Sequence, residues 1–432
     1  MKYQLQKPKQ WLSSACLIIG LSTSYAATAD KIVLTADRLI DVEAGKVIQQ
    51  PMVIIENGKF TWVGKQSAKS IPTDADRVLA LPGYSLLPGL MDMHVHLTSD
   101  ANVHGYRRLT RSTPRSAITG VKNAQATLLA GFTTVRNVGA PGYADVALRD
   151  AINEGDVLGP RMFVSGPSIG VTGGHCDNNL LPFEYAATSE GVADGPWAVK
   201  TKVRQNIKYG ADVIKFCATG GVLSKGTKVG AQQFTYTEME ALIAEAHLRG
   251  LTVAAHAHGT DGIKAAIKAG VDSIEHGSFL DPEAIELAVK MGTYLSMDIY
   301  VTEYILGEGE KAGILEESLA KERTVGKRQR QSFTNALNAG AKMVFGSDAG
   351  VYPHGNNAKQ LSRMVTFGMT PMQTLQTATI EPAKLLKKDE IIGSVTTGKL
   401  ADILAVQGNV MEDISILENV DIIIKDGVII QE

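Results

Sequence analysis

Six residues with metal-binding or proton-transferring side chains lie at the ends of short apolar segments. They are His94, His96, Lys215, His256, His276 and Asp348. Imidazoles and a carboxylate are ligands that Zn²⁺ and similar divalent ions prefer. Residues i and i+2 of a strand point to the same face, so His94 and His96 are expected to face one metal ion together. A His-x-His pair alone arises easily by chance. All six residues, however, lie at the ends of apolar segments, and together they indicate a metal site.

Lys215 lies in the apolar segment Val213-Ile-Lys-Phe216, with no acidic residue beside it. A buried ammonium next to two metal cations is strongly disfavoured. A lysine that has lost its proton can add carbon dioxide and become a carbamate, an anion with two oxygens that can bridge two metals. The alternative is a lysine whose stem is buried while its ammonium reaches solvent at the barrel mouth.

These residues need a scaffold that brings the ends of several strands together, and the middle of the chain predicts one. Short apolar strands alternate there with helices, and a glycine of the kind that ends helices precedes six of the strands. The predicted strands are 90–94, 132–136, 161–165, 212–216, 252–256, 272–276, 294–297 and 342–346. Eight such units over about 300 residues favour a (β/α)8 TIM barrel, whose active site lies at the carboxyl ends of the strands.

Two β-rich ends flank this barrel, which we assign to residues 89–388. Asn57-Gly58 and Asp426-Gly427 each separate two apolar runs, which is a hairpin signal. Neither end is long enough for a good core, so we expect residues 30–88 and 389–432 to form one small β-sandwich. Within the barrel, Thr237 with Glu240, and Thr370 with Gln373, predict capping boxes at helix starts.

Residues 1–29 have the pattern of a signal peptide. Lys2, Lys7 and Lys9 precede a short apolar stretch, and Ala27-Thr-Ala29 offers a cleavage site. Removing this segment takes away three lysines and no acidic residue from a 432-residue chain whose net charge is −2. The mature protein is then mildly acidic and is expected to be periplasmic or secreted, without a membrane anchor. Its charge argues against a nucleic-acid partner.

Only Cys176 and Cys217 remain after such cleavage, so no disulfide framework holds the fold. In an oxidising compartment the two could join, but the sequence does not establish the geometry. We favour a Cys217 that fills space in the barrel, and a disulfide stays open.

The chain resembles the amidohydrolase superfamily, and within it the prolidase-like (Xaa-Pro dipeptidase) and imidazolonepropionase-like branch. The motifs that carry the resemblance are Met91-Asp-Met-His-Val-His96, Val213-Ile-Lys215, Ala255-His-Ala-His-Gly259, Glu275-His-Gly277 and Gly346-Ser-Asp-Ala-Gly350. Together they are specific for the superfamily and less specific for the substrate.

The resemblance implies a binuclear zinc site bridged by the carbamate of Lys215. His94, His96 and Asp348 would hold the more buried metal, and His256 and His276 the other. A metal-activated hydroxide would then attack the scissile carbonyl, with Asp348 acting as general base and then as general acid.

Further residues are expected to contact the substrate. His258 lies two residues after His256, and the resemblance gives it a role in oxyanion stabilisation. His175 lies in a Gly-rich loop after the third strand that looks like the family's substrate loop. Arg136 ends the second strand and could meet a substrate carboxylate, although a structural ion pair is an equal alternative. Tyr236 is a weaker candidate of the same kind.

The preferred function is hydrolysis of amide bonds in small molecules, namely Xaa-Pro dipeptides or N-acyl amino acids, as in a dipeptidase or carboxypeptidase-like enzyme. Alternatives are hydrolysis of a cyclic amide, as in imidazolonepropionase, a deaminase, a lactonase or a phosphotriesterase. The residue three positions after His256 is Gly259, where deaminases of this superfamily carry a glutamate. A non-enzymatic binding protein is disfavoured because all six ligand positions are filled. Assembly into a homo-oligomer stays open.

Overall fold

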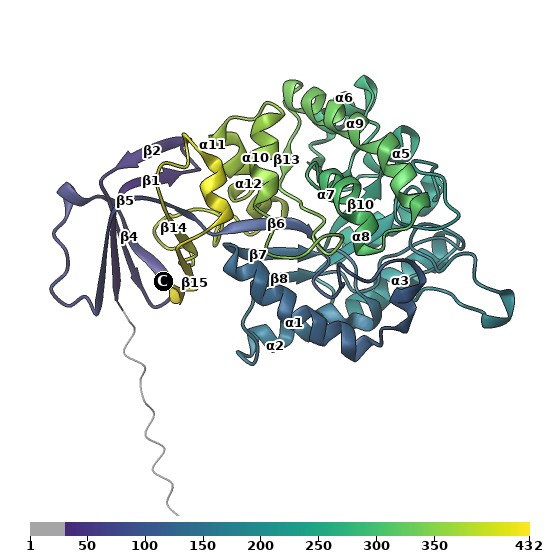
Figure 1. Cartoon of the computed structure of the whole chain (residues 1–432), viewed down its shortest axis with the longest axis horizontal. Helices are drawn as coiled ribbons and strands as arrows, with labels where there is room; N and C mark the ends of the chain where they lie inside the picture. Colours follow the sequence, from purple (N-terminus) through teal and green to yellow (C-terminus); the bar gives the residue numbers. More distant parts are fainter. Residues whose placement is uncertain (1–30) are drawn as a thin grey trace, which may run out of the picture.

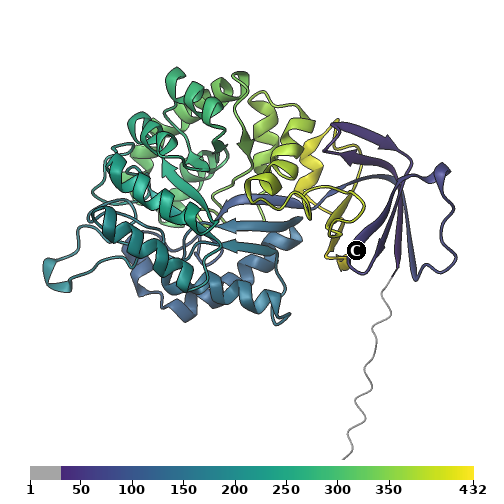
Figure 2. The same ribbon diagram turned by 180° about the vertical axis from the view of Figure 1, so that it is seen from behind.

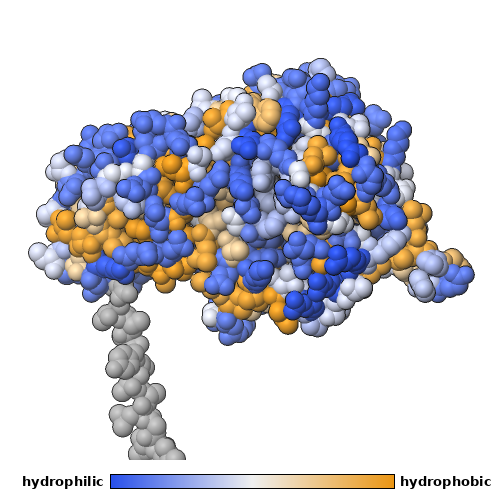
Figure 3. All heavy atoms as spheres, in the orientation of Figure 1, coloured by the Kyte–Doolittle hydropathy of each residue, from blue (hydrophilic) through white to orange (hydrophobic). Residues whose placement is uncertain are grey.

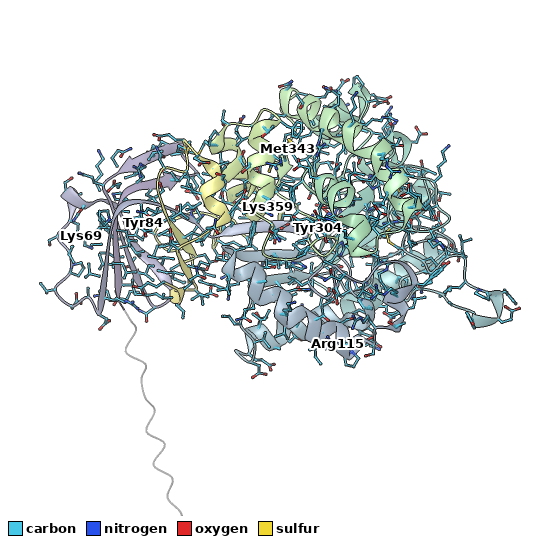
Figure 4. The ribbon with its side chains drawn as sticks, viewed as in Figure 1. Lys69, Tyr84, Arg115, Tyr304, Met343 and Lys359 are labelled. Carbon is cyan, nitrogen blue, oxygen red and sulfur yellow. A yellow bond between two sulfur atoms is a disulfide. The ribbon has the colours of Figure 1, made fainter. Side chains whose placement is uncertain are left out.

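The computed structural model describes residues 31–432, so the expected signal peptide, residues 1–29, lies outside the described residues. The chain forms a twisted sheet on one side and a larger region of alternating strands and helices on the other (Figure 1). The view from behind shows the same division (Figure 2). Lys69 and Tyr84 lie in the sheet region, whereas Met343 and Tyr304 lie in the α/β region (Figure 4).

The sheet region combines strands from both ends of the chain. Its strands are β1 (Ile32–Asp41), β2 (Lys46–Gln49), β3 (Pro51–Glu56), β4 (Lys59–Lys65), β5 (Arg77–Pro88), β14 (Ile403–Gln407), β15 (Ile422–Lys425) and β16 (Val428–Gln431). They are hydrogen-bonded in the order β16-β15-β14-β5-β1-β3-β4, with β2 on β1. The pairing of β14 with β5 confirms that the two ends fold together. They form one continuous sheet, and a two-layer sandwich stays a prediction.

Both predicted hairpins occur. Asn57 and Gly58 join β3 to β4, and Asp426 and Gly427 join β15 to β16. All four residues have positive φ, between 50° and 78°. Asn-Gly and Asp-Gly accept this backbone conformation more easily than other pairs, which is why they mark tight hairpins.

The α/β region contains all eight predicted strands. They are β6 (Leu90–Val95), β7 (Phe132–Asn137), β8 (Arg161–Val164), β9 (Val213–Cys217), β10 (Thr252–Ala257), β11 (Ser273–His276), β12 (Tyr294–Ser296) and β13 (Met343–Val344). β6, β7 and β8 form one parallel sheet, and β9 to β13 form a second. Parallel bridges between Ile169 and Phe216, and between Val95 and Ala349, connect the two sheets.

Helices surround these strands. They are α1 (Thr113–Leu129), α2 (Ala144–Asn153), α3 (Pro196–Lys208), α4 (Tyr236–Leu248), α5 (Thr260–Lys268), α6 (Pro282–Met291), α7 (Val301–Gly307), α8 (Gly309–Ala312), α9 (Glu316–Asn338), α10 (Lys359–Thr366), α11 (Pro371–Thr377) and α12 (Ile380–Leu385). Short 3₁₀ turns are η1 (Gln66–Ala68), η2 (Gly105–Thr110), η3 (Pro141–Tyr143), η4 (Phe183–Tyr185) and η5 (Ile414–Glu418). Within residues 31–432, no helix combines the length and apolarity needed to cross a membrane.

One predicted capping box is confirmed and the other is wrong by two residues. Thr370 and Gln373 cap α11 as expected, whereas α4 begins at a box formed by Thr235 and Glu238 rather than by Thr237. Both candidates fit the Thr-x-x-Glu pattern. With Thr235 as the cap, Phe234 and Met239 occupy the positions of a hydrophobic staple, and both are buried. Burial of this pair explains the choice of the earlier threonine.

The two regions are joined covalently and by ion pairs. Gly89 alone separates β5 from β6, so the sheet leads directly into the strand that carries His94. Arg161 at the start of β8 pairs with Asp402, with Nη1 and Oδ2 2.6 Å apart, and also with Asp426 of the C-terminal hairpin.

Hydrophilic residues cover most of the face in Figure 3, with smaller apolar areas between them.

Candidate metal centre

The first group of metal-binding atoms comes from the ends of β6 and β13. The imidazoles of His94 and His96 and the carboxylate of Asp348 each offer an atom, and these atoms lie within 4.8 Å of one another. His94 Nε2 and His96 Nε2 are 3.4 and 3.2 Å from Asp348 Oδ1. Although burial opposes ionisation, His94 and His96 hold the pKa of Asp348 well below its usual range. The structure therefore assembles three residues that the sequence singled out.

Asp92 fixes the backbone on both sides of this group. Its carboxylate accepts hydrogen bonds from the backbone N–H of His94 at 3.1 Å and of Ser347 at 3.0 Å. Asn357 Nδ2 donates a third at 2.8 Å. Asp92 is fully buried, and burial raises its pKa to about 6. Asp92 was not predicted as a site residue, although its position two residues before the His-x-His motif was a usable signal.

The second group comes from β10 and β11 and comprises His256, His258 and His276, again with atoms within 4.8 Å. The rings of His256 and His276 meet edge to face at 4.6 Å, and those of His258 and His276 stack at 4.7 Å. His256 Nε2 is buried without a hydrogen-bond partner among the described residues. His258 Nδ1 lies 2.7 Å from Ser278 Oγ, which fixes the ring and leaves Nε2 directed elsewhere.

Asp298, directly after β12, orients His276. Its Oδ1 lies 2.9 Å from His276 Nδ1 and accepts a hydrogen bond from Gln329 Nε2 at 2.7 Å. Although burial favours the neutral imidazole, Asp298 raises the pKa of His276. Asp298 also forms a possible ligand group with His276 and Asp348, so it links the two sets. Sequence analysis missed this role, yet an aspartate that follows a barrel strand was the same signal that identified Asp348.

Two residues of the centre adopt the left-handed backbone conformation, His276 with φ 71° and Asp348 with φ 58°. Residues without glycine's freedom rarely do so, and such strain persists only where the surroundings impose it. Here the backbone N–H of Asp348 donates to His94 O at 2.8 Å, and Gln329 donates to His276 O at 3.3 Å. These hydrogen bonds help to hold both residues in a backbone conformation that is otherwise unfavourable.

Lys215 lies on β9 with 3% of its surface exposed, and its Nζ has no hydrogen-bond partner among the described residues. Burial lowers the pKa of this amine to about 8, against an opposing effect of Glu275. At pH 7 about a tenth of such an amine is neutral, compared with about 0.03% at the ordinary lysine pKa. A buried amine without partners, and with a substantial neutral fraction, fits the chemistry of carbamate formation.

His94 and His256 are suited to ligation because burial keeps their rings neutral at pH 7. It lowers the pKa of His94 to about 4 and that of His256 well below its usual range. A neutral imidazole offers a lone pair that a protonated ring lacks. The two donor groups, the free His256 Nε2 and the unpartnered Lys215 Nζ together fit two divalent cations.

Of the two roles left open for Arg136, the structure shows the structural ion pair and not a contact with the substrate. Its side chain is fully buried, and its Nη2 lies 2.7 Å from Glu275 Oε1. Its other nitrogens donate to Met93 O at 2.7 Å and Ser273 Oγ at 2.9 Å. Glu275 in turn lies 3.1 Å from His94 Nδ1. The Arg136–Glu275 ion pair therefore helps to position His94, a candidate metal ligand. Each nitrogen of Arg136 has a partner within the protein, and the fully buried side chain does not reach a substrate.

Tyr236 is likewise not part of the centre. It is the first residue of α4, has 43% of its surface exposed, and its hydroxyl donates to Glu240 Oε1 at 3.1 Å. The capping box at Thr235 sets the start of the helix and directs Tyr236 outward. Its contact with the substrate stays a prediction.

His175 does join the centre. Its ring stacks on that of His256 at 4.0 Å, and its Nδ1 lies 2.8 Å from Ser224 Oγ. The next residue, Cys176, forms a disulfide with Cys217, which corrects the sequence-based preference for a space-filling Cys217. The bond ties the loop of His175 to β9, two residues beyond Lys215. The sequence could not reveal it, because the long loop after β8 has no periodic pattern from which to place Cys176.

Comparison with known proteins identifies the family. A model of the amidohydrolase family matches residues 85–430, most of the described chain. The chain belongs to this family. The amidohydrolase is 32% identical to ochratoxinase from Aspergillus niger over 355 residues, which cover 77% of this chain and 72% of that protein. It is 26% identical to imidazolonepropionase from Shewanella frigidimarina over 411 residues, covering 86% and 90%.

A solved structure of a Xaa-Pro dipeptidase, with methionine bound in its active site, is similar to the amidohydrolase over its length. The TM-score is 0.87 and the identity 40%, with 93% of this chain and all of that chain covered. The prolidase-like and imidazolonepropionase-like resemblance is thereby confirmed. The amidohydrolase is a hydrolase of carbon–nitrogen bonds, and its fold is of the TIM-barrel type.

Proposed function

We propose that this amidohydrolase is a binuclear zinc enzyme that cleaves the amide bond of Xaa-Pro dipeptides or N-acyl amino acids. The observation that carries the proposal is the presence of two donor groups together with a buried, unpartnered Lys215 Nζ on β9, the strand that pairs with β10. His94, His96 and Asp348 would hold one ion, and His256 and His276 the other. Lys215 would add carbon dioxide, release a proton and bridge the ions as a carbamate.

The ions supply a polarised carbonyl and a water of lowered pKa when they are bound. Asp348 takes the proton of the attacking water and returns it to the leaving nitrogen, acting as base and then as acid. His258, fixed through Ser278, donates to the carbonyl oxygen as negative charge develops on it. His175, stacked on His256, borders the substrate.

Other features belong to the same proposal. The bridges beside β6 and β9 support a closed eight-stranded barrel over residues 89–388, with the segments 30–88 and 389–432 forming a separate sheet domain. The Cys176–Cys217 disulfide favours an oxidising compartment, in line with a periplasmic or secreted enzyme. The Xaa-Pro dipeptidase and ochratoxinase relatives support an amide substrate.

Assay of the metal-loaded protein against a panel of dipeptides and N-acyl amino acids tests this function. The panel includes Xaa-Pro dipeptides, N-acetyl amino acids, a cyclic imide and a lactone, each with and without removal of metal by a chelator. We expect metal-dependent release of a free amino acid from the first two classes. Activity confined to the imide or the lactone would contradict the proposal.

A further inference from the structure

Because Arg136 is buried in an ion pair with Glu275, it remains open which cationic side chain faces the substrate. Arg108 is a candidate that the sequence analysis did not consider. It lies in η2, in the connection from β6 to α1, and therefore on the same side of the barrel as His94 and His96. Its side chain remains exposed, and its Nε donates only to Gly105 O at 3.4 Å. Within residues 31–432 it pairs with no carboxylate.

Arg108 borders a small cavity that is partly open to solvent and has apolar walls. Leu223 comes from the loop after β9, and Ile314 and Leu315 come from the segment between α8 and α9. His104 and Ser318 complete the polar part of the lining. The cavity thus combines one guanidinium with three aliphatic side chains.

Two lysines close in sequence to the lining residues already have partners. Lys225 Nζ lies 4.7 Å from the centre of the Tyr106 ring. Lys321 Nζ lies 3.1 Å from Glu317 Oε1 and donates to Ser224 O at 2.6 Å. Arg108 is the lining residue whose positive charge is left without a counterion among the described residues.

The cavity is connected to the metal centre through one loop. Leu223 lines the cavity, and its neighbour Ser224 contacts His175 Nδ1 at 2.8 Å. His175 in turn stacks on His256. The wall of the cavity and the ring of His175 are therefore connected through adjacent residues of one loop.

We propose that Arg108 binds the free carboxylate of the amino acid that leaves, and that Leu223, Ile314 and Leu315 receive its apolar side chain. A guanidinium binds a carboxylate through two parallel hydrogen bonds, which a neutral carboxamide cannot reproduce. The inference rests on the proposed function, which it deepens by naming the group that sets substrate choice. Arg108 is thus a specificity-determining residue.

Binding of L-leucine and L-leucinamide to the zinc-loaded protein tests this assignment without requiring turnover. We expect isothermal titration to give at least tenfold tighter binding of leucine. Arg108→Leu should weaken leucine binding about 10–100-fold and abolish the preference, and Arg108→Lys should give an intermediate result. Arg107→Leu, at the adjacent exposed position, is the matched control and should bind as the parent protein does.

Equal binding of leucine and leucinamide by the parent protein would overturn the proposal, and so would an Arg108→Leu variant that keeps the preference. Hydrolysis of N-acetyl-L-leucine, measured in parallel, separates this outcome from failure of the proposed function. If the parent protein hydrolyses N-acetyl-L-leucine but binds leucine and leucinamide equally, only the role of Arg108 is refuted. If the parent protein prefers leucine, Arg108→Leu loses this preference and the parent protein does not hydrolyse N-acetyl-L-leucine, the role of Arg108 is supported and the proposed reaction is refuted.

Discussion

Replacement of Asp298 by asparagine tests whether His276 is held as a metal ligand. The carboxylate accepts hydrogen bonds from His276 Nδ1 and Gln329 Nε2 through the same oxygen. An asparagine of the same size can keep both bonds only through a neutral oxygen. Loss of a charge-assisted hydrogen bond is worth about 1.5–3 kcal/mol, or about 10–150-fold in affinity. Partners of this kind typically change metal affinity about 10–100-fold.

The assay is zinc binding in competition with a chromogenic chelator, which needs no substrate. Asp298 raises the pKa of His276, so a proton competes with the metal more strongly in the parent protein than in Asp298→Asn. The deficit in affinity should therefore be larger at pH 8 than at pH 6. Asp272→Asn is the matched control, because Asp272 Oδ2 lies 2.8 Å from His247 Nε2 at the other end of β11. Asp272→Asn should bind zinc normally.

An Asp298→Asn variant that folds normally and binds zinc as tightly as the parent protein would refute this reasoning. So would an equal loss in Asp272→Asn, since that result would indicate a general effect of removing a carboxylate from an Asp–His pair. Circular dichroism of both variants verifies that each is folded before the zinc titration is interpreted.

Three further predictions concern other parts of the centre. Lys215→Met, which keeps the length but cannot form a carbamate, should bind at most one zinc per chain by elemental analysis; two ions with normal turnover would make Lys215 an ordinary lysine. Asp348→Asn should lower kcat by about 10²–10⁴-fold in steady-state assays, and a severalfold effect would leave only a supporting role. Cys176→Ser should lower the free energy of unfolding by about 2–4 kcal/mol in urea, because it opens a loop with a sequence separation of 41; an unchanged midpoint and slope would contradict a stabilising disulfide.

The strands and the main donor residues could be predicted because both depend on local patterns. Each barrel strand is a short apolar run, and residues at its carboxyl end share one face of the fold whatever the loops do. This is why His94, His256 and Asp348 were found without knowledge of distances. Asp298 follows the predicted strand 294–297 and so had the same signal, but it was not predicted as a site residue.

Interactions between distant residues were not predictable in this way. The sequence leaves the partner of a buried arginine open, and only the fold shows that Glu275 occupies the guanidinium of Arg136. Cys176 lies in a loop without periodicity, so its approach to Cys217 depends on the path of the chain. No sequence motif surrounds Arg108, so its role could be inferred only from the cavity that it lines.

We propose that two metal ions bind at the two donor groups, with a carbamate on Lys215. Anomalous diffraction at the zinc absorption edge, from crystals grown with zinc and bicarbonate, tests it directly. We expect two anomalous peaks, one beside His94, His96 and Asp348 and one beside His256 and His276, with additional density on Lys215 Nζ that reaches both. A single peak, or two peaks with an unmodified Lys215, would contradict it.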